Sequence, residues 1–163
     1  MVRRLIVLVL LVFAGITEGR AQIVALGASS TAGYGVGREA AFPTLVAKIL
    51  RSRGRPMTVR NAGISGDTTG GMLARLSRAV PEGTKIVILQ IGGNDAFKHM
   101  SPVAAAANRA EIRQRLHARG IRTIEADGLV LAALRSGLRQ PGGIHMTAEG
   151  HRRVAQEIAA QIP

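Results

Sequence analysis

The chain has 163 residues and no cysteine, which suits one domain with one core and excludes disulfide bonds and cysteine-based metal sites. Lys and Arg outnumber Asp and Glu by 22 to 10, so the formal net charge is +12. That charge would suit nucleic acid, but one tyrosine and three phenylalanines are too few for a base-stacking platform. The arginines recur mostly at helical spacing among alanines. We therefore interpret the charge as solvated helix faces and expect no nucleic-acid partner.

The first 21 residues differ in character from the rest of the chain. Two arginines precede an apolar run at residues 5–16, and "GRA" at residues 19–21 offers a small-x-small cleavage site. The run is short for a membrane span of about 20 residues, and this order is typical of a secretory signal. We therefore predict a signal peptide at 1–21, a domain at 22–163 and export to the periplasm or outside the cell. The alternative is that this segment is retained as a membrane anchor. The rest of the sequence has no second apolar run of spanning length, so we expect no stable membrane insertion after the signal is removed.

Short apolar runs alternate with longer segments of helical period through the remaining chain. The expected order is strand 22–27, helix 42–54, strand 57–63, helix 69–80, strand 85–92, helix 102–120, strand 121–126, helix 129–137 and helix 147–162. Parallel neighbours need a crossover, and the helices must bury their apolar stripes against the sheet. The pattern therefore predicts an α/β fold of three layers, α/β/α, around a short parallel sheet of four to five strands.

Ligands of such sheets bind beyond the carboxyl ends of the strands. The loops expected there are "GASSTAGYG" at 27–35, "NAGISGDTT" at 61–69, "GGNDAF" at 92–97 and "EADG" at 125–128. The first loop lacks the spacing of a phosphate-binding loop, because its glycines fall in a G-x-G-x-G pattern and no G-x-x-x-x-G-K-[ST] is present. A serine pair on a tight turn remains, where a hydroxyl can point toward a substrate.

A nucleophilic serine needs a base within hydrogen-bond reach and donors for the oxyanion that forms on attack. Of the four histidines, His99 and His117 fall in or beside the long alanine-arginine helix, and His151 is expected to cap or pack in the last helix. His145 lies in the glycine-rich stretch "RQPGGIHMTAEGH", just before that helix. A side chain in such a loop can reach over the sheet, so His145 is the candidate base.

Four stretches together resemble a known family. "IVALGASSTAGYGVG", "NAGISGDTTGGMLARL", "VILQIGGNDAF" and "GGIHMTAEGH" are similar, in this order, to blocks I, II, III and V of the SGNH (GDSL) hydrolases, in the branch of thioesterase I and arylesterase-like enzymes. The resemblance extends from residue 23 to about residue 155. It implies a flavodoxin-like fold and hydrolysis of a small acyl ester, thioester or acylated sugar without a cofactor.

The resemblance also assigns roles to particular residues. Ser29 takes the place of the nucleophile, and His145 that of the base. Gly66 and Asn94 take the places of two oxyanion donors, through a backbone N–H and a side-chain amide, and the Ser29 N–H completes the oxyanion hole. Glycine at 66 suits this role because no Cβ hinders the approaching carbonyl, and a neutral imidazole can accept the serine proton near pH 7.

The chain departs from the family at two positions. Ala28 stands where the family has the aspartate of G-D-S, and Gly142 stands where D-x-x-H would place the triad aspartate. Loss of that carboxylate can cost about ten-thousandfold in turnover. The alternatives are a slower Ser-His dyad oriented by a backbone carbonyl, a replacement carboxylate at Asp127, or an inactive acyl- or glycan-binding module. Glu149 is expected only to join the first turn of the last helix.

The segment between "GGNDAF" and "GGIH" is short, with room for one strand after the long helix. A four-strand core with a shallow, open site is therefore expected, which favours small or extended acyl groups. No metal-ligand cluster is visible in the sequence, so no metal is predicted.

Overall fold

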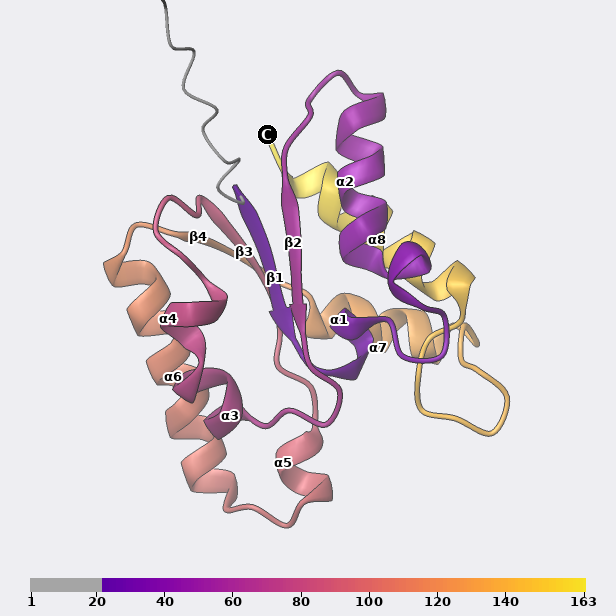
Figure 1. Cartoon of the computed structure of the whole chain (residues 1–163). Coiled ribbons are helices and arrows are strands. Elements are labelled where there is room, and N and C mark those ends of the chain that lie inside the picture. Colours follow the sequence, from indigo (N-terminus) through magenta and orange to yellow (C-terminus); the bar gives the residue numbers. More distant parts are fainter. Residues whose placement is uncertain (1–21) are drawn as a thin grey trace, which may run out of the picture.

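The computed structural model describes residues 22–163, and the predicted signal peptide at 1–21 lies outside the described residues. Its centre is a parallel sheet of four strands in the order β2-β1-β3-β4 (Figure 1). The strands are β1 (Ile23–Gly27), β2 (Val59–Gly63), β3 (Ile86–Gln90) and β4 (Arg122–Glu125). Each strand lies within a segment for which the apolar pattern predicted one, and the α/β fold is confirmed.

Helices cover both faces of this sheet. One face carries α2 (Phe42–Ser52), α7 (Asp127–Arg135) and α8 (Ala148–Gln161), and the other carries α3 (Thr69–Ala74), α4 (Leu76–Ala79) and α6 (Pro102–Ala118). Three short helices lie near the carboxyl ends of the strands: α1 (Ser29–Ala32), the 3-10 helix η1 (Arg38–Ala40) and α5 (Asn94–Phe97). Within residues 22–163, no helix has the length and apolar character that a membrane span needs.

The central strands explain the two cores. All five residues of β1 and all five of β3 are buried, as expected for strands covered on both faces. Successive side chains point to opposite faces, so Ile23 and Ile88 pack toward α2, α7 and α8, whereas Val24 and Leu89 pack toward α3, α4 and α6. The sheet therefore holds a separate apolar cluster on each side.

Among the local differences from the sequence pattern, two concern the segments that follow β1 and β2. The expected helix at 69–80 is interrupted at Arg75, whose backbone leaves the helical region with φ −103° and ψ 6°. The Arg75 side chain donates to the carbonyl oxygens of Gly27 and Ala62, so that residue is bound to the strand ends instead of to solvent. In addition, α1 begins directly at Ser29, where only a turn was expected.

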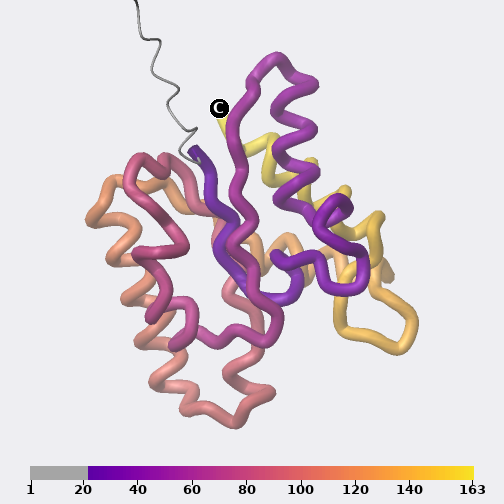
Figure 2. The backbone as a smooth tube through the Cα atoms, in the orientation of Figure 1, coloured from indigo at the N-terminus to yellow at the C-terminus, as the bar shows by residue number. Residues whose placement is uncertain are grey.

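The loops that follow the strands meet at one end of the molecule. Figure 2 shows this end at the bottom of the view, where the turn after β1, the turn after β2, the α5–α6 connection and the loop between α7 and α8 lie. Ligand sites of parallel α/β sheets form at this end.

Candidate active site

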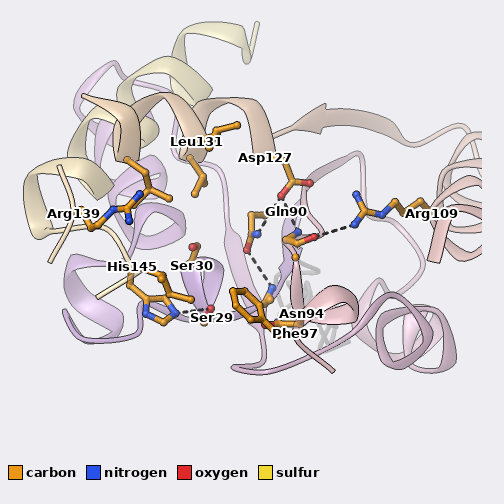
Figure 3. Close-up of a pocket in the computed structure, with 16 residues that line it drawn as sticks. Ser29, Ser30, Gln90, Asn94, Phe97, Arg109, Asp127, Leu131, Arg139 and His145 are labelled. Atoms are coloured by element: carbon orange, nitrogen blue, oxygen red, sulfur yellow. Dashed lines mark hydrogen bonds between the residues drawn. The ribbon is translucent and has the colours of Figure 1, made fainter. Parts of the chain in front are cut away.

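Ser29 and His145 lie in direct contact, although 116 residues separate them in the chain. Ser29 is the first residue of α1, immediately after β1, and its Oγ lies 2.9 Å from Nε2 of His145 (Figure 3). Both side chains are partly exposed, while the neighbouring Ser30 is buried. A hydroxyl and an imidazole at this distance form the pair that general-base activation of a serine requires.

The loop that carries His145 is held in place by its own hydrogen bonds. Gln140 N donates to the carbonyl oxygen of His145 at 2.9 Å, and Arg139 forms an antiparallel bridge with Met146. The Gln140 side chain donates to the carbonyl oxygens of Tyr34, at 3.0 Å, and Met146, at 2.7 Å. The bond to Tyr34 fixes the loop to the segment that follows α1, the short helix that begins at Ser29.

The imidazole of His145 packs against an aromatic ring. The ring centroids of Tyr34 and His145 are 4.5 Å apart. Burial lowers the pKa of His145 below its ordinary value of 6.5, because desolvation disfavours the charged imidazolium. At neutral pH the imidazole is therefore neutral, which is the form that can accept a proton.

No carboxylate completes the arrangement in the part of the chain that the structure describes. Gly142 is exposed with φ +66°, and an added Cβ there would meet no atom within 4 Å. Glu149 pairs instead with Arg152 in α8. The hydrogen bonds of residues 22–163 include none between His145 and an aspartate or glutamate.

Asp127, the predicted replacement carboxylate, has a different set of partners. Its oxygens accept from Gln90 Nε2 at 3.2 Å, Ile91 N at 3.0 Å and Gly92 N at 2.8 Å. The side-chain oxygen of Gln90 in turn accepts from Ala28 N at 3.3 Å. Asp127 thus anchors the loop after β3 and, through Gln90, the turn before Ser29, instead of contacting the imidazole.

Gly66 and Asn94, the two other predicted oxyanion donors, are connected through Asp67. Asn94 opens α5, and its Nδ2 donates to the carbonyl oxygen of Asp67 at 2.8 Å. Gly66 adopts a φ of +77° in the turn just before Asp67, a conformation that glycine adopts at little cost. Within residues 22–163, no acceptor binds the backbone N–H of Ser29 or of Gly66, so both donors are available to a ligand.

A nearly buried ion pair supports the turn after β2. Arg75 Nε donates to Asp67 Oδ2 at 2.8 Å, and each side chain is only 10% exposed. The same guanidinium binds the last residue of β1, Gly27, through its carbonyl oxygen at 3.2 Å. Arg75 therefore holds the loop of the candidate oxyanion donors against the strand that leads to Ser29.

Ser29 and His145 open into a cavity of about 400 Å³ (Figure 3). Its apolar wall is formed mainly by Val130, Leu131 and Leu134 of α7, and Arg109 and Arg139 also line it. Asn94 and Asp127 line the same cavity, whereas Gly66 is outside the lining. The described residues contain no group of three or more His, Cys, Asp or Glu side chains that could hold a metal ion.

The contacts that orient these groups involve residues that sequence reasoning did not single out, namely Tyr34, Arg75, Gln90 and Gln140. None of them carries chemistry of its own. Their partners include the carboxylates of Asp67 and Asp127 and carbonyl oxygens or rings of other segments, and no local spacing in the sequence reveals these contacts. Tyr34, as the single tyrosine of the chain, was the one available signal.

Comparison with known proteins finds similarity to proteins that are named as esterases. The GDSL-like lipase/acylhydrolase family matches residues 25–139. The arylesterase of Vibrio mimicus is 31% identical over 113 residues, which cover 69% of this chain and 56% of the arylesterase. Esterase TesA of Pseudomonas aeruginosa is 33% identical over 103 residues, 63% of this chain and 51% of TesA. The chain thus spans about half the length of the curated relatives it matches.

The fold comparison agrees with the sequence comparison. The psychrotrophic esterase EstA from Pseudoalteromonas sp. superposes with a TM-score of 0.75 over 87% of this chain and 96% of EstA, at 19% identity. That likeness shows a shared fold. The family match itself takes in well over half of the residues, including both Ser29 and Asn94. The chain therefore belongs to the GDSL-like lipase/acylhydrolase family.

Proposed function

We propose that the protein is a serine hydrolase of small acyl esters or thioesters, with Ser29 as nucleophile and His145 as base. The observation that carries this proposal is the 2.9 Å contact between Ser29 Oγ and His145 Nε2. The family match ends at residue 139, before the histidine loop, so the role of His145 rests on this geometry. The arylesterase and esterase names of the relatives support an ester as the substrate.

The proposed reaction has two steps. Ser29 Oγ attacks the acyl carbonyl while its proton passes to His145 Nε2, and the oxyanion accepts from the N–H groups of Ser29 and Gly66 and from Asn94 Nδ2. Collapse of this intermediate breaks the bond to the alcohol or thiol, which leaves with the proton of His145. A water molecule, deprotonated by His145, then attacks the acyl-serine and releases the carboxylic acid and free Ser29.

The base operates as part of a dyad in this proposal. Packing on Tyr34 and the loop bonds of Gln140 orient the imidazole, while no carboxylate stabilises the imidazolium that forms on attack. Turnover is therefore expected below that of a complete triad, by up to about ten-thousandfold.

The direct test is hydrolysis of p-nitrophenyl acetate and butyrate. The parent protein should hydrolyse them, and Ser29→Ala should abolish turnover because it removes the hydroxyl that lies 2.9 Å from His145 Nε2. Ser77→Ala, which alters an exposed serine of α4, is the matched control and should leave the rate unchanged. A phosphonate probe should add one equivalent to the parent and none to Ser29→Ala. Equal rates in the parent and Ser29→Ala would refute the hydrolase proposal.

An acyl- or glycan-binding module without turnover is the second candidate. It is favoured by one observation, the exposed glycine at 142 where the family pattern has aspartate. A folded parent that neither hydrolyses the esters nor reacts with the phosphonate would support this candidate.

We further propose that the protein is exported to the periplasm or outside the cell, on the basis of the basic and apolar segments within residues 1–21. N-terminal sequencing of the protein recovered from expressing cells should find Gln22 first. A chain that retains Met1 and stays in the cytosolic fraction would contradict export.

A further inference from the structure

Large exposed apolar side chains gather at one end of the molecule. Within residues 22–163 there are seven, and all of them belong to segments that follow the carboxyl ends of strands: Tyr34, Ile64, Phe97, Met100, Val103, Leu131 and Ile144. We call this set the apolar rim. Single exposed apolar residues are ordinary, but their collection on one face marks a surface that contacts something apolar.

The most prominent part of the apolar rim is the connection between α5 and α6, at the bottom of Figure 1. Every residue of 96–104 is exposed to solvent, including those in the flanking turns of α5 and α6. Phe97 is 68% exposed and Val103 is 80% exposed. Lys98 and His99 lie between them, so this segment combines apolar groups with basic ones and contains no acid.

The rim extends beyond the candidate active site. Phe97, Leu131 and Ile144 line the cavity that holds Ser29 and His145, so substrate contact accounts for their exposure. Met100 and Val103 lie outside that lining. The apolar surface therefore continues from the mouth of the cavity over the α5–α6 connection, where a small substrate alone would not cover it.

The charge at this end is positive. Asp67 is paired with Arg75, and Asp95 accepts from the hydroxyl and N–H of Thr69. Asp127 is occupied by three N–H donors, as described above. Lys98 and Arg139 form no salt bridge with any acid of residues 22–163. Lys98 and Arg139 therefore lie beside the apolar rim without an acidic partner among the described residues, while the three aspartates are bound.

We propose that the apolar rim docks the protein on a lipid surface that carries anionic headgroups, with the α5–α6 connection in the interface. Apolar side chains flanked by Lys and Arg gain from both the acyl boundary and the headgroup charge. A second copy of the chain fits less well, because the same cations would face each other. In the docked orientation the cavity mouth faces the lipid, so an acyl chain can reach Ser29 directly.

The test uses the absence of native cysteine. Val103→Cys and Lys85→Cys place single thiols at opposite ends of the molecule, because Lys85 precedes the first residue of β3 and Val103 follows its carboxyl end, and both positions are exposed. Each is labelled with an environment-sensitive fluorophore and mixed with vesicles of phosphatidylcholine alone or with phosphatidylglycerol added. We expect a blue shift and protection from an aqueous quencher at 103, only with the anionic vesicles, and none at 85.

A matched pair of charge reversals then tests the cations. Lys98→Glu in the 103-labelled protein should raise the lipid concentration for half-maximal shift by roughly tenfold, because a cation in the interface is replaced by an anion. Lys85→Glu makes the same charge change at the far end and should have little effect.

Three outcomes would overturn docking at the rim: no shift at 103, equal shifts at 103 and 85, or a shift that follows protein concentration without vesicles, which indicates self-association. The measurement is made in the Ser29→Ala background, so it needs no turnover. A hydrolase that fails to dock and a docking protein that fails to hydrolyse are therefore distinguishable.

Discussion

Gly142 is the residue at which a single change is expected to improve the proposed reaction. Its φ of +66° lies in the left-handed region that aspartate and asparagine tolerate better than most side chains, and the space beside it is open. A carboxylate three residues before His145 can orient the imidazole and stabilise the imidazolium. We expect Gly142→Asp to raise kcat by roughly tenfold or more toward p-nitrophenyl butyrate.

Gly142→Asn is the control for this change, because it has nearly the same shape and backbone preference but no charge. A higher kcat in Gly142→Asp but not in Gly142→Asn identifies the carboxylate as the cause. Equal gains in both variants would mean that a stiffer loop is responsible and that the charge contributes nothing.

The pH dependence of turnover reports on His145. The base works only when it is neutral, and burial holds its pKa below 6.5. The activity of the parent should therefore be constant near neutral pH and fall only as the pH drops through this lowered pKa. A profile of kcat/KM should show the midpoint of the acid limb below 6.5, and a midpoint at or above 6.5 would contradict the burial argument.

At this scale the sequence alone named the candidate side chains, but it did not name the residues that contact and orient them. Ser29, Asn94 and His145 stand in short stretches whose residue types and order resemble a family, and the structure brings Ser29 and His145 together. The interpretation of Asp127 rested only on its place at the end of a strand. That place does not specify which way the carboxylate faces, and it faces the backbone of the loop after β3.

At the scale of elements, Asp127 joins three strand ends into one unit. It starts α7 after β4, binds the loop that follows β3, and reaches the turn after β1 through Gln90. Asparagine at 127 would keep one acceptor oxygen and turn an NH₂ group toward N–H donors. We expect Asp127→Asn to lower the free energy of unfolding by about 1–3 kcal/mol and to reduce kcat more than it changes KM.

Urea unfolding and steady-state kinetics check this prediction together. Glu125→Gln is the matched control, since Glu125 lies two residues away in a half-exposed ion pair with Arg113. This change should lower the free energy of unfolding by less than about 1 kcal/mol. Equal effects of the two changes on kcat would remove the positioning role from Asp127.

Element type was easier to predict than element ends. The buried runs of β1 and β3 and the periodic α8 follow directly from the apolar pattern. The break between α3 and α4 does not, because it accompanies bonds from Arg75 to carbonyls of β1 and β2 that form only in the folded sheet.

For the molecule as a whole, His151 links stability to pH. It is buried, its Nδ1 accepts from Phe42 N at 3.2 Å, and its ring stacks on the Phe42 ring. Burial, with a smaller contribution from His145, lowers the pKa of His151 from 6.5 to about 4. The unfolded chain binds this proton more readily than the folded one does. The contribution of His151 to the free energy of unfolding should thus be fully present above pH 6.5 and fall as the pH drops toward 4.

At the acid end of this pH range, His151 lowers the free energy of unfolding by about 3 kcal/mol at most. Urea unfolding between pH 6.5 and 4 should show that the free energy of unfolding falls steeply with decreasing pH in the parent. It should fall less steeply in His151→Leu, even though that variant is less stable overall. His117→Gln, at an exposed position of α6, should keep the parent slope. Parallel slopes in the parent and His151→Leu would assign the acid sensitivity to other groups.

The sequence by itself determined the layered α/β fold, because the period of its apolar residues decides which segments can be strands or helices and which faces must be buried. It also determined the candidate nucleophile and oxyanion donors, which stand in short contiguous motifs. Only the tertiary structure decided that His145 meets Ser29, that Asp127 does not meet His145, and that the exposed apolar residues share one end. These facts depend on the direction of side chains from segments far apart in the chain, and local periodicity contains no information about such directions.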